Sequence, residues 1–202
     1  MEGLSPVMEP FCTVCGTPFT GGAGGGHPCH ACMKDPPHFD SARASLVYAG
    51  LIKEAVHLFK YGHVRAVKEF LGGFIQETAI RWFGGSDVVA AVPLHYRRFR
   101  ARGFNQSLFM AEYASLAVGA RLSIDALARI RNTRPQVELG PAEREENVRG
   151  AFSVLSPREF EGASVLLVDD VYTTGATVKE CSRVLKAAGA NSVSVLTVAR
   201  AV

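Results

Sequence analysis

The feature that most limits how this chain can fold is an apolar run that ends in two adjacent carboxylates. Residues 164–168 read SVLLV, and Asp169 and Asp170 follow them directly. An apolar run of this length, between Gly162 and a turn rich in threonine and glycine, predicts a central parallel strand that is buried on both faces. Open α/β sheets bind ligands beyond the carboxyl ends of their strands. We therefore expect both carboxylates to lie in a ligand-binding crevice.

The residues after the carboxylates predict a phosphate site. Apolar residues recur at helical spacing from residue 176 to residue 188, and Gly189 is a suitable C-terminal cap, so residues 173–177 form the turn that enters a helix. Backbone N–H groups at a helix start lack partners and lie at the positive end of the macrodipole, and Gly175 lets the main chain approach a ligand closely. The hydroxyl groups that complete this cradle belong to Thr173, Thr174 and Thr177.

Paired carboxylates beside a phosphate cradle favour one class of ligand. They would repel a bare polyphosphate, but they can accept hydrogen bonds from the vicinal hydroxyls of a sugar phosphate, with a divalent cation nearby. The alternative is an ordinary turn that is stabilised by an aspartate and followed by a helix with a threonine cap. That alternative accounts for one carboxylate and one hydroxyl of this segment and leaves the others unexplained.

Composition excludes several classes of protein. A chain of 202 residues can hold one α/β domain and a small appendage. Its 48% hydrophobic and 20% charged residues are typical of a globular protein, and its net charge of +3 is too small to argue by itself for a nucleic-acid partner. Because no apolar run approaches the length of a membrane helix and no basic-then-apolar leader begins the chain, we expect a cytoplasmic protein without membrane insertion.

Four of the five cysteines form a predicted zinc site. Two Cys-x-x-Cys pairs are separated by residues 16–28, and each pair can present two thiolates on one side of a tight turn. Four thiolates leave no open coordination position, so the zinc ion would be structural. The alternatives are a redox pair or two disulfides, and His27 or His30 could replace a thiolate. The expected ligands are Cys12, Cys15, Cys29 and Cys32.

A proline pair divides the chain. Asp35-Pro36-Pro37 is a natural linker because consecutive prolines stop regular structure. We expect residues 1–38 to form a zinc ribbon, with residues 1–10 loosely attached, and residues 39–202 to form the α/β domain. In that domain a strand over residues 44–49 precedes helices over residues 52–61 and 64–82, which break at Gly62. Lys60 is expected to complement the dipole at the end of the first helix.

An arginine-rich segment follows a second buried strand, residues 88–92, which Pro93 ends. Residues 93–106 are expected to form a loop, in which Arg97, Arg98, Arg100 and Arg102 fall within six positions. If this strand and the acidic strand belong to one sheet, the segment after it lies near the same crevice. Its guanidinium groups would suit phosphate oxygens there. The alternatives are a solvated basic loop and a nucleic-acid footprint interleaved with aromatic residues. Asn105 is expected to cap a helix that ends near residue 118.

Residues 129–152 lack a regular period. Residues 131–136 contain a proline and are expected to form a loop, after which Pro141 can begin a short charged helix. A polar loop between two strand–helix units is typical of an active-site lid. It is equally typical of a solvated connection, and the residues alone leave both interpretations open.

These motifs resemble two known patterns. Residues 165–177 are similar to the phosphoribosyl-pyrophosphate signature of type I phosphoribosyltransferases, in which an acidic pair follows four apolar residues and precedes Thr-Thr-Gly-Ala-Thr after two variable positions. Over nearly its whole length the chain resembles the ComF family, phosphoribosyltransferase-like proteins that are associated with bacterial natural competence and related to the GntX proteins. The residues that carry this resemblance are the four cysteines, Val92-Pro93-Leu94, Arg102-Gly103-Phe104-Asn105-Gln106, Thr133-x-Pro135-Gln136, Arg144-x-x-Asn147-x-x-Gly150-Ala151-Phe152 and the acidic pair. Residues 135–147 also resemble the flexible loop of amidophosphoribosyltransferases, whereas His95 and Tyr172 occupy variable positions.

The resemblance implies a fold and a donor site. The fold is α/β of the type I phosphoribosyltransferase kind: a mostly parallel, Rossmann-like sheet flanked by helices, with the small zinc ribbon at its N-terminal end. Asp169 and Asp170 would be catalytic and hold the ribose hydroxyls of phosphoribosyl pyrophosphate, which binds with Mg²⁺. Residues 173–177 would bind the 5-phosphate, residues 92–95 would lie at the pyrophosphate, and residues 133–147 would close as a lid. The expected substrate-binding residues are Val171, Tyr172, Thr173, Thr174, Gly175, Ala176, Thr177, Pro93, Leu94, His95, Arg102, Asn105, Gln136, Arg144 and Asn147.

Two functions are consistent with this predicted fold and donor site. The first is enzymatic transfer, or sensing, of a ribose 5-phosphate. The second is a non-enzymatic adaptor for DNA uptake, in which the ribbon and the arginine segment bind single-stranded DNA or a helicase partner. Nothing in the sequence specifies the acceptor of a transfer reaction.

Overall fold

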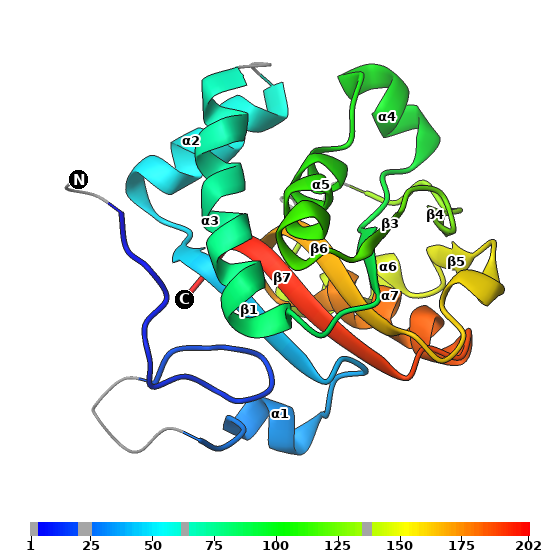
Figure 1. The fold of residues 1–202 in the computed structure, drawn as a ribbon, viewed down its shortest axis with the longest axis horizontal. Helices are drawn as coiled ribbons and strands as arrows, with labels where there is room; N and C mark the ends of the chain where they lie inside the picture. The colour runs from blue at the N-terminus through cyan, green and yellow to red at the C-terminus, as the bar shows by residue number, and fades with distance from the viewer. Residues whose placement is uncertain (1–3, 20–25, 62–64, 135–138) are drawn as a thin grey trace.

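The computed structural model describes residues 4–19, 26–61, 65–134 and 139–202. Its centre is a five-stranded sheet in the order β1-β7-β6-β2-β3, in which every neighbouring pair is parallel (Figure 1). This confirms the predicted α/β class with a mostly parallel sheet. The strands of this sheet are β1 (Ser41–Val47), β2 (Val88–Ala91), β3 (Arg121–Ser123), β6 (Ser164–Tyr172) and β7 (Ser192–Arg200).

Strand β6 is buried on both faces, as its apolar run predicts. Val165 and Leu167 belong to one core cluster, and the alternate residues Leu166 and Val168 belong to the other. Successive side chains of a strand point to opposite faces, so an uninterrupted apolar run supplies both cores at once.

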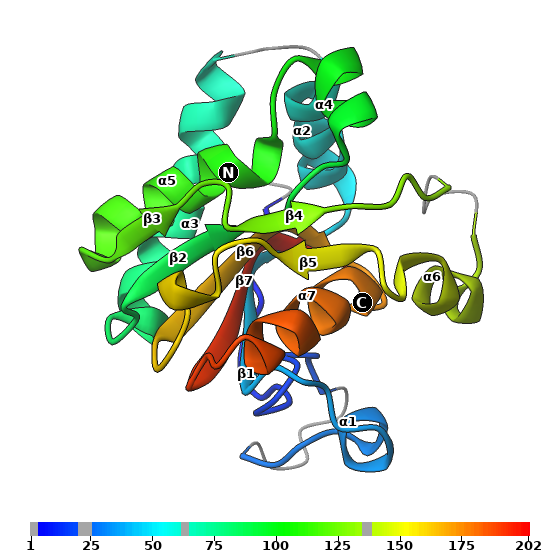
Figure 2. The same cartoon turned by 90° about the vertical axis from the view of Figure 1, so that its right-hand side faces the viewer.

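Helices cover both faces of the sheet (Figure 2). On one face lie α2 (Gly50–Tyr61), α3 (Arg65–Phe83) and α5 (Gln106–Val118), whose apolar residues share a core with Leu166 and Val168. On the other face lies α7 (Ala176–Ala187), together with a two-stranded antiparallel sheet of β4 (Leu127–Arg129) and β5 (Phe152–Val154). No helix in the described ranges is long and apolar enough to cross a membrane.

The ribbon packs on the same face as α7. Cys12 and Cys15 are buried in the core cluster that contains Val165 and Leu167, while α1 (His30–Lys34) lies at the edge of the molecule (Figure 1). The chain around residue 6 is not loosely attached, contrary to expectation. It pairs with the free edge of β1, because Val7 N–H donates to the Ser45 carbonyl at 3.2 Å and Val47 N–H donates to the Ser5 carbonyl at 2.7 Å.

Two elements differ from the predicted ones. Residues 93–106 contain a helix, α4 (Tyr96–Arg102), where a loop is expected. His95 caps it by accepting a hydrogen bond from Arg97 N–H, and Gly103 ends it with a φ of 83°. The other difference is in β6, which continues through the two carboxylates to Tyr172 because β7 runs beside it as far as Arg200.

Two further elements agree with their expected type. Asn105 caps α5, and α6 (Pro141–Val148) begins with Pro141 in its first turn, as predicted. A short 3₁₀ turn, η2 (Pro157–Glu159), precedes β6. The predicted helix break at Gly62, most of the glycine-rich ribbon loop, and the lid residues Pro135 and Gln136 lie outside the described residues.

Candidate functional site

An open cleft of about 770 Å³ lies where α2, α4, β6 and the start of α7 meet, at the carboxyl edge of the sheet. Most of the predicted substrate-binding residues line it, so residues that are far apart in sequence converge on one site. Those that line the cleft are Pro93, Leu94, Arg102, Arg144, Asp169, Asp170, Val171, Tyr172, Thr173, Gly175, Ala176 and Thr177.

Four of the predicted site residues lie outside the lining of the cleft. Their side chains form hydrogen bonds with backbone groups instead. His95 caps α4, and Asn105 caps α5 while its Nδ2 donates to the Val92 carbonyl at 3.1 Å. Thr174 Oγ1 accepts from Ala176 N–H at 3.4 Å, and Asn147 makes two 3.1 Å hydrogen bonds to the backbone of Arg134. Gln136 lies outside the described residues.

The two carboxylates have different surroundings. Asp169 Oδ1 accepts from Ser107 Oγ at 2.9 Å and from Asp170 N–H at 2.9 Å, and no cation pairs with it among the ion pairs of the described residues. Burial and the adjacent Asp170 carboxylate raise the pKa of Asp169 to about 7. Asp169 therefore changes its charge near neutral pH.

Asp170 is held as an anion. Its Oδ2 lies 2.5 Å from Lys60 Nζ and 3.3 Å from Gln106 Nε2, and its Oδ1 accepts from Val171 N–H at 2.7 Å. Burial opposes ionisation, but the Lys60 ammonium outweighs it and lowers the pKa of Asp170. Arg102 extends this network, since its Nη1 donates to Gln106 Oε1 at 2.7 Å.

Sequence reasoning missed Lys60 and Ser107, although a signal for each was present. The buried residues Ile52, Val56 and Phe59 define the inner stripe of α2, and Lys60 follows Val56 by four positions, so it belongs to that stripe. A lysine on a buried stripe requires an acidic partner. Ser107 likewise begins the buried stripe of α5, which continues at Met110.

Arg129 was also missed as a site residue. It is buried, its guanidinium lies 5.1 Å from the centre of the Phe152 ring, and its Nε has no hydrogen-bond partner among the described residues. Arg98 approaches it from α4, because Arg98 donates to the Thr133 carbonyl at 2.7 Å and Arg129 donates to the Thr133 hydroxyl. Burial and the Arg98 charge lower the pKa of Arg129. Two arginines that face one cleft suit an anionic ligand.

The predicted phosphate loop, residues 173–177, joins β6 to α7 and requires glycine at its centre. Gly175 is the N-cap of α7 and has a φ of 79°. A Cβ atom at this position would lie 2.6 Å from Cζ of Tyr172, so both the backbone conformation and the space exclude a side chain. The loop therefore leads directly into the positive end of α7.

The cleft as a whole is cationic. Its lining has two acidic residues, Asp169 and Asp170, which both belong to β6. The basic residues of the lining outnumber them and come from α2, α4, β4 and α6. They are Lys53, Lys60, Arg98, Arg102, Arg129 and Arg144. This charge pattern suits a polyanion that also carries hydroxyl groups near the acidic pair.

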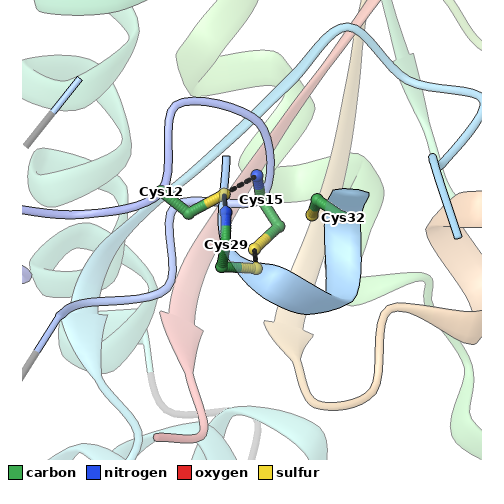
Figure 3. A group of neighbouring side chains, drawn as sticks. All are labelled: Cys12, Cys15, Cys29 and Cys32. Atoms are coloured by element: carbon green, nitrogen blue, oxygen red, sulfur yellow. Dashed lines mark hydrogen bonds between the residues drawn. The ribbon is translucent and has the colours of Figure 1, made fainter. Parts of the chain in front are cut away.

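The four predicted zinc ligands come together at the ribbon (Figure 3). Their sulfur atoms all lie within 4.8 Å of one another, and Cys15 Sγ is 3.7 Å from Cys29 Sγ. A tetrahedral site with Zn–S bonds of about 2.3 Å has sulfur–sulfur edges of about 3.8 Å, so this spacing fits zinc. His27 and His30 are exposed and lie outside the cluster.

Backbone N–H groups favour thiolates in this cluster. Cys12 Sγ accepts from Cys29 N–H at 3.1 Å and from Cys15 N–H at 3.4 Å. Burial raises the pKa of Cys12, but these backbone hydrogen bonds more than offset it and bring the pKa to about 6. The five cysteines of the chain are all unpaired thiols, which does not support the alternative of two disulfides.

A parallel sheet with an acidic pair on its central strand, a glycine turn into a helix, and an arginine-lined cleft define a protein of the phosphoribosyltransferase type. A family model described as the phosphoribosyl transferase domain matches residues 106–201. The DNA utilization protein YhgH of Escherichia coli O6:H1 is 31% identical over 191 residues, which cover 92% of this chain and 82% of that protein. The chain therefore belongs to the ComF family of phosphoribosyltransferase-like proteins.

Relatives with competence names support the same assignment. Competence protein F of Haemophilus influenzae is 28% identical over 95% of this chain and 85% of its own length. Competence protein ComFC of Bacillus subtilis is 27% identical over 98% of this chain and 80% of its own length. Among solved structures, the glutamine phosphoribosylpyrophosphate amidotransferase of B. subtilis aligns with a TM-score of 0.48 and 20% sequence identity. The alignment covers 71% of this chain and 30% of the amidotransferase chain.

Proposed function

We propose that the cleft binds phosphoribosyl pyrophosphate together with Mg²⁺, and that the protein transfers or senses its ribose 5-phosphate. One observation carries this proposal: the acidic pair on β6 shares one cleft with the glycine turn of α7 and six basic side chains. Phosphoribosyl pyrophosphate has two phosphate ends joined by a diol, which matches this combination of acidic and basic groups.

Each part of the cleft has a proposed role. The Asp169 and Asp170 carboxylates accept hydrogen bonds from the ribose hydroxyls, and residues 173–177 bind the 5-phosphate at the start of α7. Arg98 and Arg129, which both contact Thr133, bind the pyrophosphate. Arg144, which lines the cleft from α6, carries positive charge at its mouth as part of the proposed lid.

Magnesium fits this cleft together with the substrate. The protein offers two carboxylates here, and Asp170 is already paired with Lys60 at 2.5 Å. Mg²⁺ prefers six oxygen ligands and usually binds through one or two carboxylates plus phosphate oxygens. Asp169 and Asp170 would hold the ion with the substrate, and the ion would neutralise charge on the pyrophosphate.

The proposed chemistry breaks the bond between the anomeric carbon and the pyrophosphate oxygen. The electron pair leaves with the pyrophosphate, whose charge the arginines stabilise, and an acceptor nucleophile forms the new bond to the anomeric carbon. A closed lid keeps water from the cationic sugar in this step. The site supports the donor half of this reaction, and the acceptor is open.

Several further assignments belong to the same proposal. Zinc in the four-cysteine site would be structural, residues 1–38 would form the ribbon, and residues 39–202 the phosphoribosyltransferase-like domain. The names of the relatives support a role in competence and DNA uptake, and a cytoplasmic location is part of the same proposal.

A second candidate function is a non-enzymatic adaptor that binds single-stranded DNA or a helicase partner. The observation that favours it is α4, where the exposed rings of Tyr96 and Phe99 alternate with the exposed Arg97 and Arg100. Rings that stack on bases beside phosphate-binding arginines are typical of single-strand binding. Salt-sensitive binding to an oligonucleotide that is lost in the Arg97→Ala/Arg100→Ala variant would favour this candidate.

Thermal unfolding with ligand tests the first function. Millimolar phosphoribosyl pyrophosphate with Mg²⁺ should raise the melting temperature, because a ligand that binds only the folded state stabilises it. The Asp169→Asn/Asp170→Asn variant should lose this shift, and Asp125→Asn, which changes an exposed carboxylate outside the cleft lining, should keep it. An unchanged melting curve for the unaltered protein would overturn the proposal.

A further inference from the structure

Arg200 joins the ribbon to the sheet from the last residue of β7. Its side chain is buried, Nη1 donates to the Cys15 carbonyl, and Nη2 donates to Thr17 Oγ1 at 2.7 Å. Thr17 Oγ1 in turn lies 3.0 Å from Cys15 Sγ. The guanidinium therefore contacts the loop that presents one of the four sulfur atoms.

The same guanidinium contacts the strand that leads into the phosphate loop. Arg200 Cζ lies 4.5 Å from the centre of the Tyr172 ring, and Phe39 meets that ring edge-on at 6.4 Å between centroids. Parallel pairing of β6 and β7 places Tyr172 beside Arg200 in register. Tyr172 fills the space beside Gly175, where an added Cβ atom would lie 2.6 Å from Tyr172 Cζ.

Charge balance explains why a buried arginine occupies this position. No carboxylate forms an ion pair with Arg200 in the described parts of the chain. Four thiolates with one zinc ion carry a net charge of −2, which a nearby guanidinium offsets. Arg200 hydrogen-bonds the Cys15 loop, so a metal-bound cluster would supply the counter-charge that a buried guanidinium needs.

We propose that Arg200 and Tyr172 are positioning residues that couple the ribbon to the phosphate loop. The metal-bound ribbon fixes Arg200, Arg200 fixes the ring of Tyr172, and the ring holds the backbone at Gly175 in its left-handed conformation. Loss of the metal or of either side chain loosens residues 173–177 and weakens phosphate binding. This inference rests on the proposed function for its ligand, and on the contacts above for the coupling.

Arg43 provides a matched control. It is also a partly buried arginine that contacts the ribbon, since its Nη1 donates to the Thr13 carbonyl at 3.1 Å. Its guanidinium lies 4.8 Å from the centre of the Phe11 ring and 4.9 Å from that of Trp82, on the side of α3. Arg43 thus holds the ribbon without touching Tyr172 or the phosphate loop.

The experiment measures ribose 5-phosphate affinity by calorimetry in zinc-loaded protein, with zinc content determined for each variant. Arg200→Gln and Tyr172→Leu should each lose about tenfold in affinity at full zinc content, a typical coupling between sites. Their double variant should bind no more weakly than either single variant, because both interrupt one chain of contacts. Arg43→Gln, which leaves Tyr172 and its contacts in place, should bind within about twofold of the unaltered protein.

Amide hydrogen exchange gives a readout that needs no ligand. Chelation of zinc should accelerate exchange at residues 173–176 in the unaltered protein, and Arg200→Gln should show that faster exchange before chelation. If Arg200→Gln matches Arg43→Gln in both affinity and exchange, the coupling is refuted. If the unaltered protein does not bind ribose 5-phosphate, the exchange measurements alone decide the coupling, and the melting test with phosphoribosyl pyrophosphate decides the proposed function separately.

Discussion

The cysteine cluster and the cleft both concentrate charge, but they are assembled differently. The cluster takes its four sulfur atoms from residues 12–32 of one small ribbon, and its backbone N–H groups lower the pKa of Cys12 to about 6. The cleft takes its charged groups from α2, α4, β4, β6 and α6, and burial with a neighbouring carboxylate raises the pKa of Asp169 to about 7. The ribbon therefore stabilises its thiolates locally, whereas the charges of the cleft meet only in the folded chain, where burial disfavours the ionised form of Asp169.

The largest expected effect comes from breaking the cysteine cluster. Cys32→Ser should remove zinc and lower the free energy of unfolding by about 4–5 kcal/mol, because loss of a structural metal is among the most destabilising changes. Urea unfolding and metal analysis measure both effects. Cys181→Ser is the matched control, since Cys181 is a buried cysteine of α7 outside the cluster, and this variant should keep its zinc. Equal unfolding curves for Cys32→Ser and the unaltered protein would mean that the ribbon has no structural metal.

The next effect distinguishes the two carboxylates of the cleft. Asp170→Asn turns an NH₂ group toward Lys60 and Gln106, which are both donors, and should destabilise the protein by about 3 kcal/mol. Lys60→Met in the Asp170→Asn background should restore much of that loss, because it removes the unpaired charge. Urea midpoints of the two single variants and the double variant form the cycle, and additive losses would contradict a direct ion pair.

Asp169→Asn should act in the opposite direction. Asparagine keeps the Oδ1 that accepts from Ser107 and from Asp170 N–H, but it removes the partly buried negative charge. The variant should be more stable by about 2 kcal/mol at pH 8 and lose ligand binding, a trade-off common at functional sites. A destabilised Asp169→Asn would show that its ionised form is favoured in the folded protein.

The pH dependence of stability follows from the same group. The pKa of Asp169 rises from 3.8 to about 7 on folding, so the folded protein binds a proton in this window that the unfolded chain has released. The contribution of Asp169 to the free energy of unfolding is therefore full below pH 4 and falls as the pH rises toward 7. Urea midpoints between pH 5 and pH 8 should show this slope in the unaltered protein, and Asp169→Asn should remove that part of it.

The smallest expected effect is on ligand affinity, when one arginine of the Arg98–Arg129 pair is changed. Arg129→Gln should weaken phosphoribosyl pyrophosphate binding about tenfold, or about 1.4 kcal/mol, and leave ribose 5-phosphate binding unchanged, because only the former carries pyrophosphate. Calorimetric titration with both ligands measures the difference. Arg131→Gln, an exposed neighbour that contacts the Asn147 and Arg149 carbonyls, is the control. An equal loss for both ligands would place Arg129 at the 5-phosphate end instead.

Local sequence patterns predict part of this molecule, and contacts between distant residues make up the rest. The ribbon ligands follow from two short spacings, and the phosphate loop follows from a contiguous strand and turn, so both are local patterns. The partner of Asp170 is Lys60, which is 110 positions away, and only the packing of α2 against the sheet brings them together. Helical spacing alone places Lys60 on a buried stripe, but it does not identify the acid that it meets.

The arginine segment shows a second limit. The sequence places its charges near the crevice, and Arg98 and Arg102 do line the cleft. It does not separate them from Arg97 and Arg100, which α4 turns toward solvent. That division depends on the helical phase of α4, which the expectation of a loop after the strand does not contain.

The most direct test of the account is a calorimetric titration of the full chain with phosphoribosyl pyrophosphate and Mg²⁺ at pH 8. We predict saturable one-to-one binding that Asp169→Asn/Asp170→Asn abolishes and Asp125→Asn preserves. Absence of binding to the unaltered, zinc-loaded protein at millimolar ligand, or equal binding to the double variant, would contradict the account.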